Sequence, residues 1–95
     1  MNTYVTLLNY TDQGAQNLKQ SPERAAEFRR EAEAAGITVV AQLWTAGAYD
    51  GVLVLQAEKE ETILQLLARL ASQGNVRTHS LRAFDAAEFS RALAR

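Results

Sequence analysis

The spacing of apolar residues alternates along this chain between a period of two and a period of about 3.6, which constrains the fold more than any other feature. Thr3–Tyr10 is rich in β-branched and aromatic residues and is apolar on both sides of an extended chain. Val52–Leu55 is an unbroken apolar run, which is typical of a central strand. Ile37–Thr45 predicts a strand that forms a hairpin with it, and Val76–Phe84 predicts a more polar strand at a sheet edge.

Helical segments are predicted between the first two strands. Asp12 is expected to cap a short helix from about Gln13, which Gly14 weakens. Ser21 is expected to be the N-cap of a second helix with Pro at its first position, so a break separates the two segments. Gly36 is expected to end this second helix in a left-handed conformation. Its apolar face consists of Ala25, Phe28 and Ala32.

Glu58–Ser72 predicts the clearest helix, because isoleucine and leucine recur at helical spacing before Gly74 closes it. Asp85 and Glu88 have capping-box spacing and predict a short final helix, whose Phe89 and Leu93 are expected to dock on the body. The order is therefore β-α-β-β-α-β with a C-terminal helix. This order predicts one α+β domain over residues 1–95, with a ferredoxin-like four-stranded antiparallel sheet and two helices on one of its faces.

Two helices cover only one face of such a sheet, so apolar residues on the other face are left in contact with water. This face is expected to contain Leu8, Val40 and Trp44, together with either Val52 and Val54 or Leu53 and Leu55. An apolar patch of this kind is normally an interface. Two sheets packed face to face would bury on the order of 1,500 Å² in total, so we predict a homodimer, with higher homo-oligomers as an extension.

Composition excludes several classes of function. The 95 residues include no cysteine, which rules out disulfides, thiolate metal sites and cysteine nucleophiles. Ten Lys and Arg residues stand against 11 Asp and Glu residues, so no basic surface favours nucleic acid as a partner. No targeting or membrane-spanning segment is recognised, and we expect a cytoplasmic protein without a membrane partner, a metal or a cofactor. Haem ligation by His79 is left open.

Six residues are candidates for ligand binding. Tyr49 and Asp50 lie at the glycine-rich hairpin, where they either bind a ligand or serve the turn itself. Arg77 and His79 share one strand face, which suits an anionic ligand, although an edge strand also carries such residues for solubility. Asn9 lies among apolar neighbours and is expected to face the hairpin backbone, a turn or a ligand.

Aromatic and basic side chains complete the survey. Trp44 can line a ligand cavity with Tyr4, Tyr10 and Phe84, or these rings belong to the core or an interface. Arg24, Arg29 and Arg30 alternate with glutamates, which is typical of a solvated helix face.

Five short segments together resemble the GYD domain family, and the likeness extends over nearly the whole chain. These segments are Asn9–Gly14, Ser21–Arg24, Trp44–Gly51, Gly74–Thr78 and Ala83–Asp85. The resemblance implies a ferredoxin-like fold with a dimeric α/β-barrel type of assembly. It brings no set of catalytic residues, so each candidate residue depends on its own chemistry.

Two hypotheses for the function remain. The first is a homo-oligomeric module that binds a small ligand or another protein. The second is a cofactor-independent small barrel enzyme, an oxygenase or isomerase acting on an aromatic or enolisable substrate. In that enzyme Arg77 would stabilise an oxyanion and His79 or Asp50 would move a proton. Convergence of these three side chains on one closed cavity would favour the enzyme.

Overall fold

A four-stranded antiparallel sheet with the order β2-β3-β1-β4 forms the centre of the molecule. The computed structural model describes residues 1–94. The strands are β1 (Asn2–Tyr10), β2 (Thr38–Trp44), β3 (Gly51–Ala57) and β4 (Val76–Ala83). The predicted central position of the Val52–Leu55 run and the predicted edge position of the polar strand are both confirmed.

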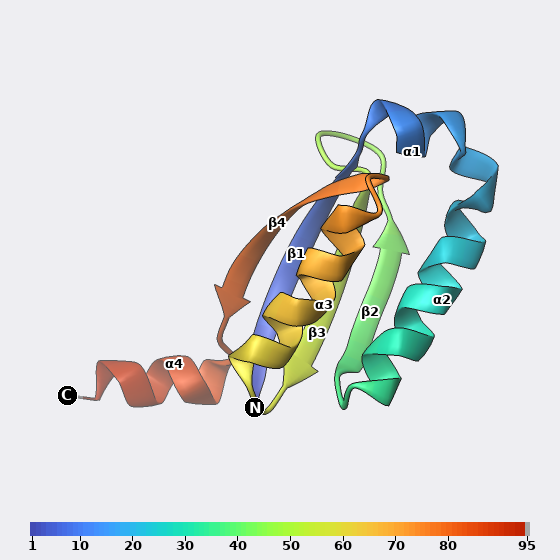
Figure 1. The fold of residues 1–95 in the computed structure, drawn as a ribbon. Helices are drawn as coiled ribbons and strands as arrows, with labels where there is room; N and C mark the ends of the chain where they lie inside the picture. The colour runs from blue at the N-terminus through green and yellow to red at the C-terminus, as the bar shows by residue number, and fades with distance from the viewer. Residues whose placement is uncertain (95) are drawn as a thin grey trace.

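The chain forms four α-helices and a 3-10 helix within residues 1–94, and the two long helices, α2 and α3, lie on one side of the sheet (Figure 1). The helices are α1 (Asp12–Gln16), a 3-10 helix (Leu18–Gln20), α2 (Ser21–Ala34), α3 (Glu60–Ser72) and α4 (Ala86–Leu93). Helix α2 packs on β2, and α3 packs across β3 and β4. The order β-α-β-β-α-β and the ferredoxin-like α+β fold are therefore confirmed.

The core lies between the sheet and the two long helices. Every member of the buried cluster comes from α2, α3, the residue before β2, or the strand faces that point toward the helices. The cluster consists of Phe28, Ala32, Ile37, Val39, Leu53, Leu55, Ala57, Ile63 and Leu66. Thr6 is also fully buried on this side, where its hydroxyl bonds that of Ser80 at 2.9 Å. Burial of this one face fixes the strand register, because a shift of one residue would turn the apolar set outward.

The helix starts differ from the sequence prediction in their capping residues. Thr11 rather than Asp12 is the N-cap of α1, and its hydroxyl oxygen accepts a hydrogen bond from the Gly14 amide at 3.1 Å. Ser21 lies inside α2, whose N-cap is Gln20. The hydroxyl of Ser21 turns inward instead, toward side chains of the sheet. The predicted break before Ser21 is confirmed, because the 3-10 helix occupies it.

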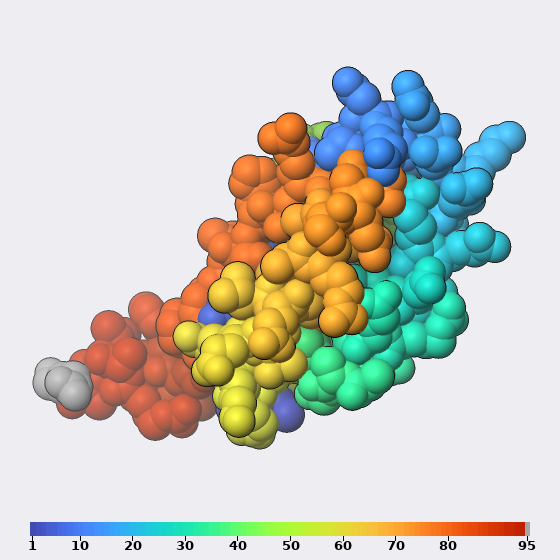
Figure 2. All heavy atoms as spheres, viewed as in Figure 1, coloured from blue at the N-terminus to red at the C-terminus, as the bar shows by residue number. Residues whose placement is uncertain are grey.

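Helix α4 projects from the body rather than docking on it (Figures 1 and 2). Its capping box is present, with Asp85 and Glu88 each bonding the other's backbone amide. Phe89 and Leu93 are nevertheless 58% and 68% exposed, so the prediction that they dock is wrong. The chain leaves the end of β4 before α4 begins, and no layer of the described chain faces the helix there.

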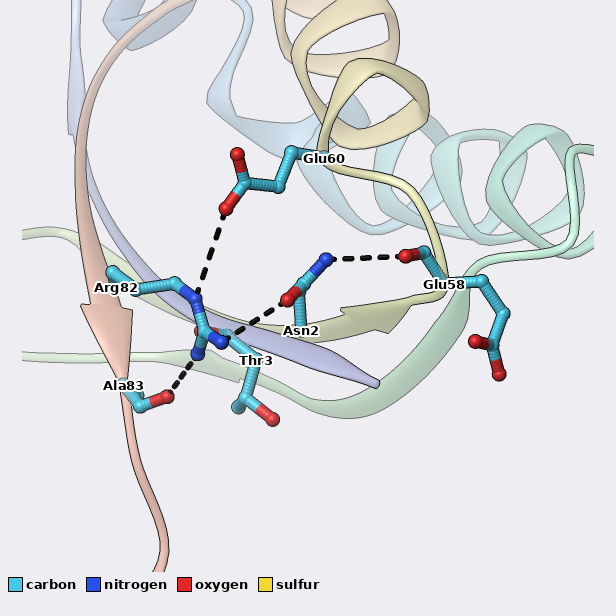
Figure 3. A network of polar contacts seen from close by, with 6 residues as sticks. All are labelled: Asn2, Thr3, Glu58, Glu60, Arg82 and Ala83. Atoms are coloured by element: carbon cyan, nitrogen blue, oxygen red, sulfur yellow. Dashed lines mark hydrogen bonds and ion pairs between the residues drawn. The ribbon is translucent and has the colours of Figure 1, made fainter. Parts of the chain in front are cut away.

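Arg82 links several chain segments at the end of the sheet where β1 begins and β4 ends (Figure 3). Its guanidinium donates hydrogen bonds to the carbonyl oxygens of Thr3 and Ala83 and to the Asn2 side chain, and lies 4.0 Å from the Glu60 carboxylate. The same group stacks 4.5 Å from the centroid of the Phe84 ring.

The phenol of Tyr4 also belongs to this end of the sheet. Burial raises the pKa of Tyr4 above its ordinary value, and the neighbouring Glu60 carboxylate adds to the rise, whereas Arg82 opposes it. The rings of Tyr4 and Phe84 both lie near the Arg82 guanidinium, at 5.8 and 4.5 Å from centroid to Cζ. Both rings are thus at the end of the sheet where α3 starts, away from the cavity described below.

Replacement of Gly14 by alanine is expected to be more destabilising than the same change at Gly36. A Cβ atom at Gly14 would overlap the carbonyl oxygen of Asn75, a backbone atom that already accepts the Thr11 amide. Gly36 has φ of +83° but open space around it. Alanine there is therefore expected to lower the free energy of unfolding only by the cost of the left-handed conformation, about 1–2 kcal/mol. Urea denaturation followed by circular dichroism measures both variants. An equal loss of free energy of unfolding in the two would contradict the predicted contact.

Candidate functional site

One face of the sheet has no helix over it, and we call it the open face. Thr6, Leu53 and Leu55 point into the core, so the residues that alternate with them point the other way. The apolar side chains of the open face are Val5, Leu7, Leu43, Val52, Val54 and Leu81. Leu43 and Leu81, on the two edge strands, are 59% and 56% exposed. The expected apolar face is therefore present, with Val52 and Val54 rather than Leu53 and Leu55 on it.

A β-bulge at Val40 changes which residues of β2 reach this face. Val39 pairs with Leu55 and Ala41 pairs with Val54, so Val40 is an extra residue without a partner in β3. Beyond the bulge the alternation is reversed, and Leu43 rather than Trp44 lies on the open face.

The predicted positions of Trp44 and Leu8 on the open face are therefore wrong. The indole nitrogen of Trp44 donates to the Ser21 hydroxyl of α2 at 3.0 Å, on the helix side. Leu8 pairs with Gly51 and belongs to the same side as Thr6, because side chains two residues apart share a face. Val40 itself remains 53% exposed, as expected.

Asn9 and Asp50 tie the hairpin loop to the end of β1. The Asn9 amide nitrogen donates to the carbonyl oxygen of Ala48 at 2.9 Å. The Asp50 carboxylate accepts the backbone amide of Tyr10 at 2.8 Å, and the Asp50 amide donates to the Leu8 carbonyl at 2.8 Å. Both side chains thus bond main-chain groups of a neighbouring segment.

Four candidate residues gather at one corner of the open face, which we call the polar corner: Asn9, Tyr49, Arg77 and His79. Arg77 is the direct cross-strand neighbour of Asn9. The rings of Tyr49 and His79 meet edge to face, with centroids 5.9 Å apart and planes at 69°. Asp50 and Trp44 bond groups away from this corner, so the structure does not bring His79, Arg77 and Asp50 together on one cavity.

A cavity of about 80 Å³ lies on the helix side of the sheet, near the hairpin. Its walls come from the first turns of α2, the end of α3 and neighbouring parts of the sheet. Apolar side chains dominate them, including Leu8, Phe28, Trp44, Leu53 and Leu70. Of the four aromatic residues predicted to line a pocket together, Trp44 and Tyr10 line this cavity.

Ser21, Gln42 and Arg24 line the cavity as well, and sequence analysis assigned none of them to a site. Ser21 bonds both the Trp44 indole and the Tyr10 hydroxyl, and Gln42 donates to the Ala25 carbonyl at 3.0 Å. Arg24 is half-buried rather than solvated, unlike the exposed Arg29 and Arg30. Gln42 was the one signal in the sequence for this site. A polar side chain in an otherwise apolar strand indicates a hydrogen-bond partner in the helix layer.

Two features are absent from residues 1–94. Within this range, no group of three or more His, Asp or Glu side chains is arranged to hold a metal ion. No helix in the same range has the length and apolar character needed to cross a membrane.

Replacement of Asp50 by alanine is expected to destabilise the fold by about 1–3 kcal/mol, because the partly buried end of β1 loses the charged acceptor of the Tyr10 amide. Asp50→Asn keeps an acceptor oxygen in place and is expected to lose less than half as much. Trp44 is the only tryptophan, so its fluorescence reports unfolding in urea. Equal stability of wild type and Asp50→Ala would show that this bond contributes nothing.

Comparison with known proteins identifies close relatives. A Thermus thermophilus protein named glutamine synthetase and cystathionine beta-lyase binding protein is 40% identical over 89 residues, which cover 93% of this chain and 94% of that protein. The crystal structure of TTHA0845, also from Thermus thermophilus, matches with a TM-score of 0.61 and 25% identity, over 90% of this chain and 96% of that one.

A glycine-to-threonine mutant of Rv3291c matches with a TM-score of 0.58 over 90% of this chain and 52% of that one. At 17% identity, this likeness concerns the fold alone. The sequence profile of the GYD domain matches residues 4–93. The chain therefore belongs to the GYD domain family.

Proposed function

We propose that this protein is a protein-binding module that works as a homodimer and takes glutamine synthetase or cystathionine β-lyase as its partner. The observation that carries the homodimer is the open face, an apolar sheet surface with no layer of the described chain over it. The name of the Thermus thermophilus relative, at 40% identity over nearly the full length of both chains, supports the choice of partner.

A second copy of the chain is the occupant we assign to the open face. The face carries leucine and valine on all four strands, whereas its few polar groups lie toward its ends. A surface of this kind is costly to leave in water at all times, which favours a permanent partner over a transient one. Two sheets packed face to face about a twofold axis bury on the order of 1,500 Å², which is sufficient for a stable dimer.

The polar corner fits the rim of such an interface. Specific interfaces place apolar side chains at the centre and hydrated polar groups around them. Arg77 and His79 lie on an edge strand, and Tyr49 belongs to the exposed hairpin loop. We assign these residues to the rim rather than to a catalytic site, because the Asp50 carboxylate is held by the Tyr10 amide.

Helix α4 is the second element that we assign to the dimer. An isolated helix of eight residues is marginal in water without a surface to pack on. Phe89 and Leu93 lie one turn apart on α4 and are both more than half exposed. Packing of this apolar stripe on the second copy would stabilise the helix and remove both side chains from water.

Substitution of Leu43 by aspartate is expected to abolish the dimer, because it places a charge within the apolar part of the proposed interface. Phe89→Asp is expected to weaken the dimer at least tenfold through α4. Leu64→Asp is the matched control, since Leu64 is 69% exposed on α3, in the opposite layer. Analytical ultracentrifugation at micromolar concentration gives the mass of each species.

Wild type and Leu64→Asp should sediment at twice the chain mass of 10.5 kDa, and Leu43→Asp at the chain mass. A wild-type chain that sediments as a monomer would refute the dimer. A Leu43→Asp variant that remains a dimer would show that the open face is not the interface.

Direct binding to purified glutamine synthetase and cystathionine β-lyase tests the partner assignment. We expect saturable binding to at least one of the two immobilised enzymes, with a Kd in the micromolar range or below, about −8 kcal/mol or stronger. An unrelated immobilised enzyme is the control for adhesion. Absence of saturable binding to both enzymes would refute the proposed partners and leave the dimer to be judged separately.

A further inference from the structure

The cavity on the helix side of the sheet has no part in the proposed dimer. It lies between α2, α3 and the sheet, so a second copy packed on the open face does not fill it. One water molecule needs about 10–15 Å³ of such space, and this cavity measures about 80 Å³. The space therefore corresponds to several water molecules, or to an organic molecule about the size of one aromatic ring.

The walls of this cavity are mainly apolar and partly aromatic. Leu8, Leu53 and Leu70 line it from β1, β3 and the end of α3. Phe28 of α2 and Trp44 of β2 add aromatic side chains. Such walls do not replace the hydrogen bonds that water gives up on entering, so they hold water weakly. An apolar molecule that covers them removes this surface from water, which is favourable.

Most of the polar side chains at the cavity have partners within the chain. Trp44 donates to Ser21 at 3.0 Å, and the hydroxyls of Ser21 and Tyr10 bond each other at 2.9 Å. Gln42 donates to the backbone of α2, and the Asp50 carboxylate accepts the amide of Tyr10. A bound molecule is therefore not needed to complete these hydrogen bonds.

The charged side chains at the cavity do not favour an ion. Arg24 and Asp50 carry opposite charges, so together they bring no net charge to the wall. Nη1 of Arg24 donates to the Asn17 carbonyl oxygen at 2.9 Å. Nη2 of Arg24 has almost no accessible surface, so a molecule in the cavity cannot bond it. Because an ion loses hydration in apolar surroundings without gaining a partner, a neutral molecule of the same size is favoured.

We propose that this cavity binds a neutral aromatic molecule of about one ring. The side chains of Phe28 and Trp44 offer such a ring the edge and face contacts that aromatic pairs prefer. Leucine side chains supply the rest of the apolar contact. The cavity is partly open to solvent, so a ring can enter it in the folded protein and a small polar substituent on the ring can stay hydrated.

Titration with benzyl alcohol, followed by the fluorescence of Trp44, tests the site. Trp44 is the only tryptophan and lines the cavity, so a bound ring should change its emission. We expect a saturable change with a Kd in the millimolar range or below, which is ordinary for a ligand of so few atoms. Protonated benzylamine and benzoate carry the same ring with a charged group, and each should bind at least tenfold more weakly.

Ala25→Leu tests whether binding takes place in this cavity. Ala25 lines the cavity and lies one turn before the buried Phe28 on α2, so leucine there should occupy part of the space. Its affinity for benzyl alcohol is expected to fall at least tenfold. Ala26→Leu is the matched control, because Ala26 is exposed on the same helix, and it should bind like wild type. The comparison of the three probes on wild type needs no variant and stands even if Ala25→Leu fails to fold.

Three results would overturn the proposal. Trp44 is 51% exposed, so an emission that stays unchanged or changes only linearly with benzyl alcohol would mean collision without a site. Equal or tighter binding of a charged probe would refute the neutral ligand. Equal affinity of wild type and Ala25→Leu would place the binding outside this cavity. None of these outcomes depends on the oligomeric state or on a partner enzyme.

Discussion

Burial of only one face of the sheet is the constraint on which the rest of this structure depends. The helices α2 and α3 form a single layer, and the core cluster lies entirely between that layer and the sheet. Because side chains alternate across a strand, every buried residue of β1 and β3 has a neighbour that must point the other way. Many of those neighbours are valine or leucine, and they form the open face. The apolar content of the central strands thus leaves a surface that no layer of residues 1–94 covers.

The order of the elements was predictable from sequence because each depends on local signals. These signals include the apolar period, Pro22 at a helix start, and Gly36 and Gly74 in the left-handed conformation. Each of them determines the conformation of only a few neighbouring residues. The bulge at Val40 left no comparable signal, and it reversed the alternation for the rest of β2. One extra residue therefore exchanged Leu43 and Trp44 between the two faces, which moved the tryptophan from the expected interface to the cavity.

The candidate site was harder to predict than the fold because its contacts join distant segments. Asn9 and Asp50 were candidates for ligand binding, but their partners in the structure, the backbone of Ala48 and of Tyr10, lie about 40 residues away. Serine is a residue type that favours the N-cap position, yet the hydroxyl of Ser21 bonds Trp44 and Tyr10 instead. Arg24 looked like part of a solvated stripe, since its burial depends on how α2 meets the sheet. Side-chain roles of this kind follow from packing between layers rather than from local pattern.

The cavity and the open face lie back to back on the same strand. In β3, Leu53 faces the cavity, while its neighbours Val52 and Val54 point to the open face. The packing around the cavity and a second copy on the open face would therefore act on opposite sides of one strand. Because protein interiors are close-packed, a substitution that moves Leu53 is expected to change the fit of the open face as well.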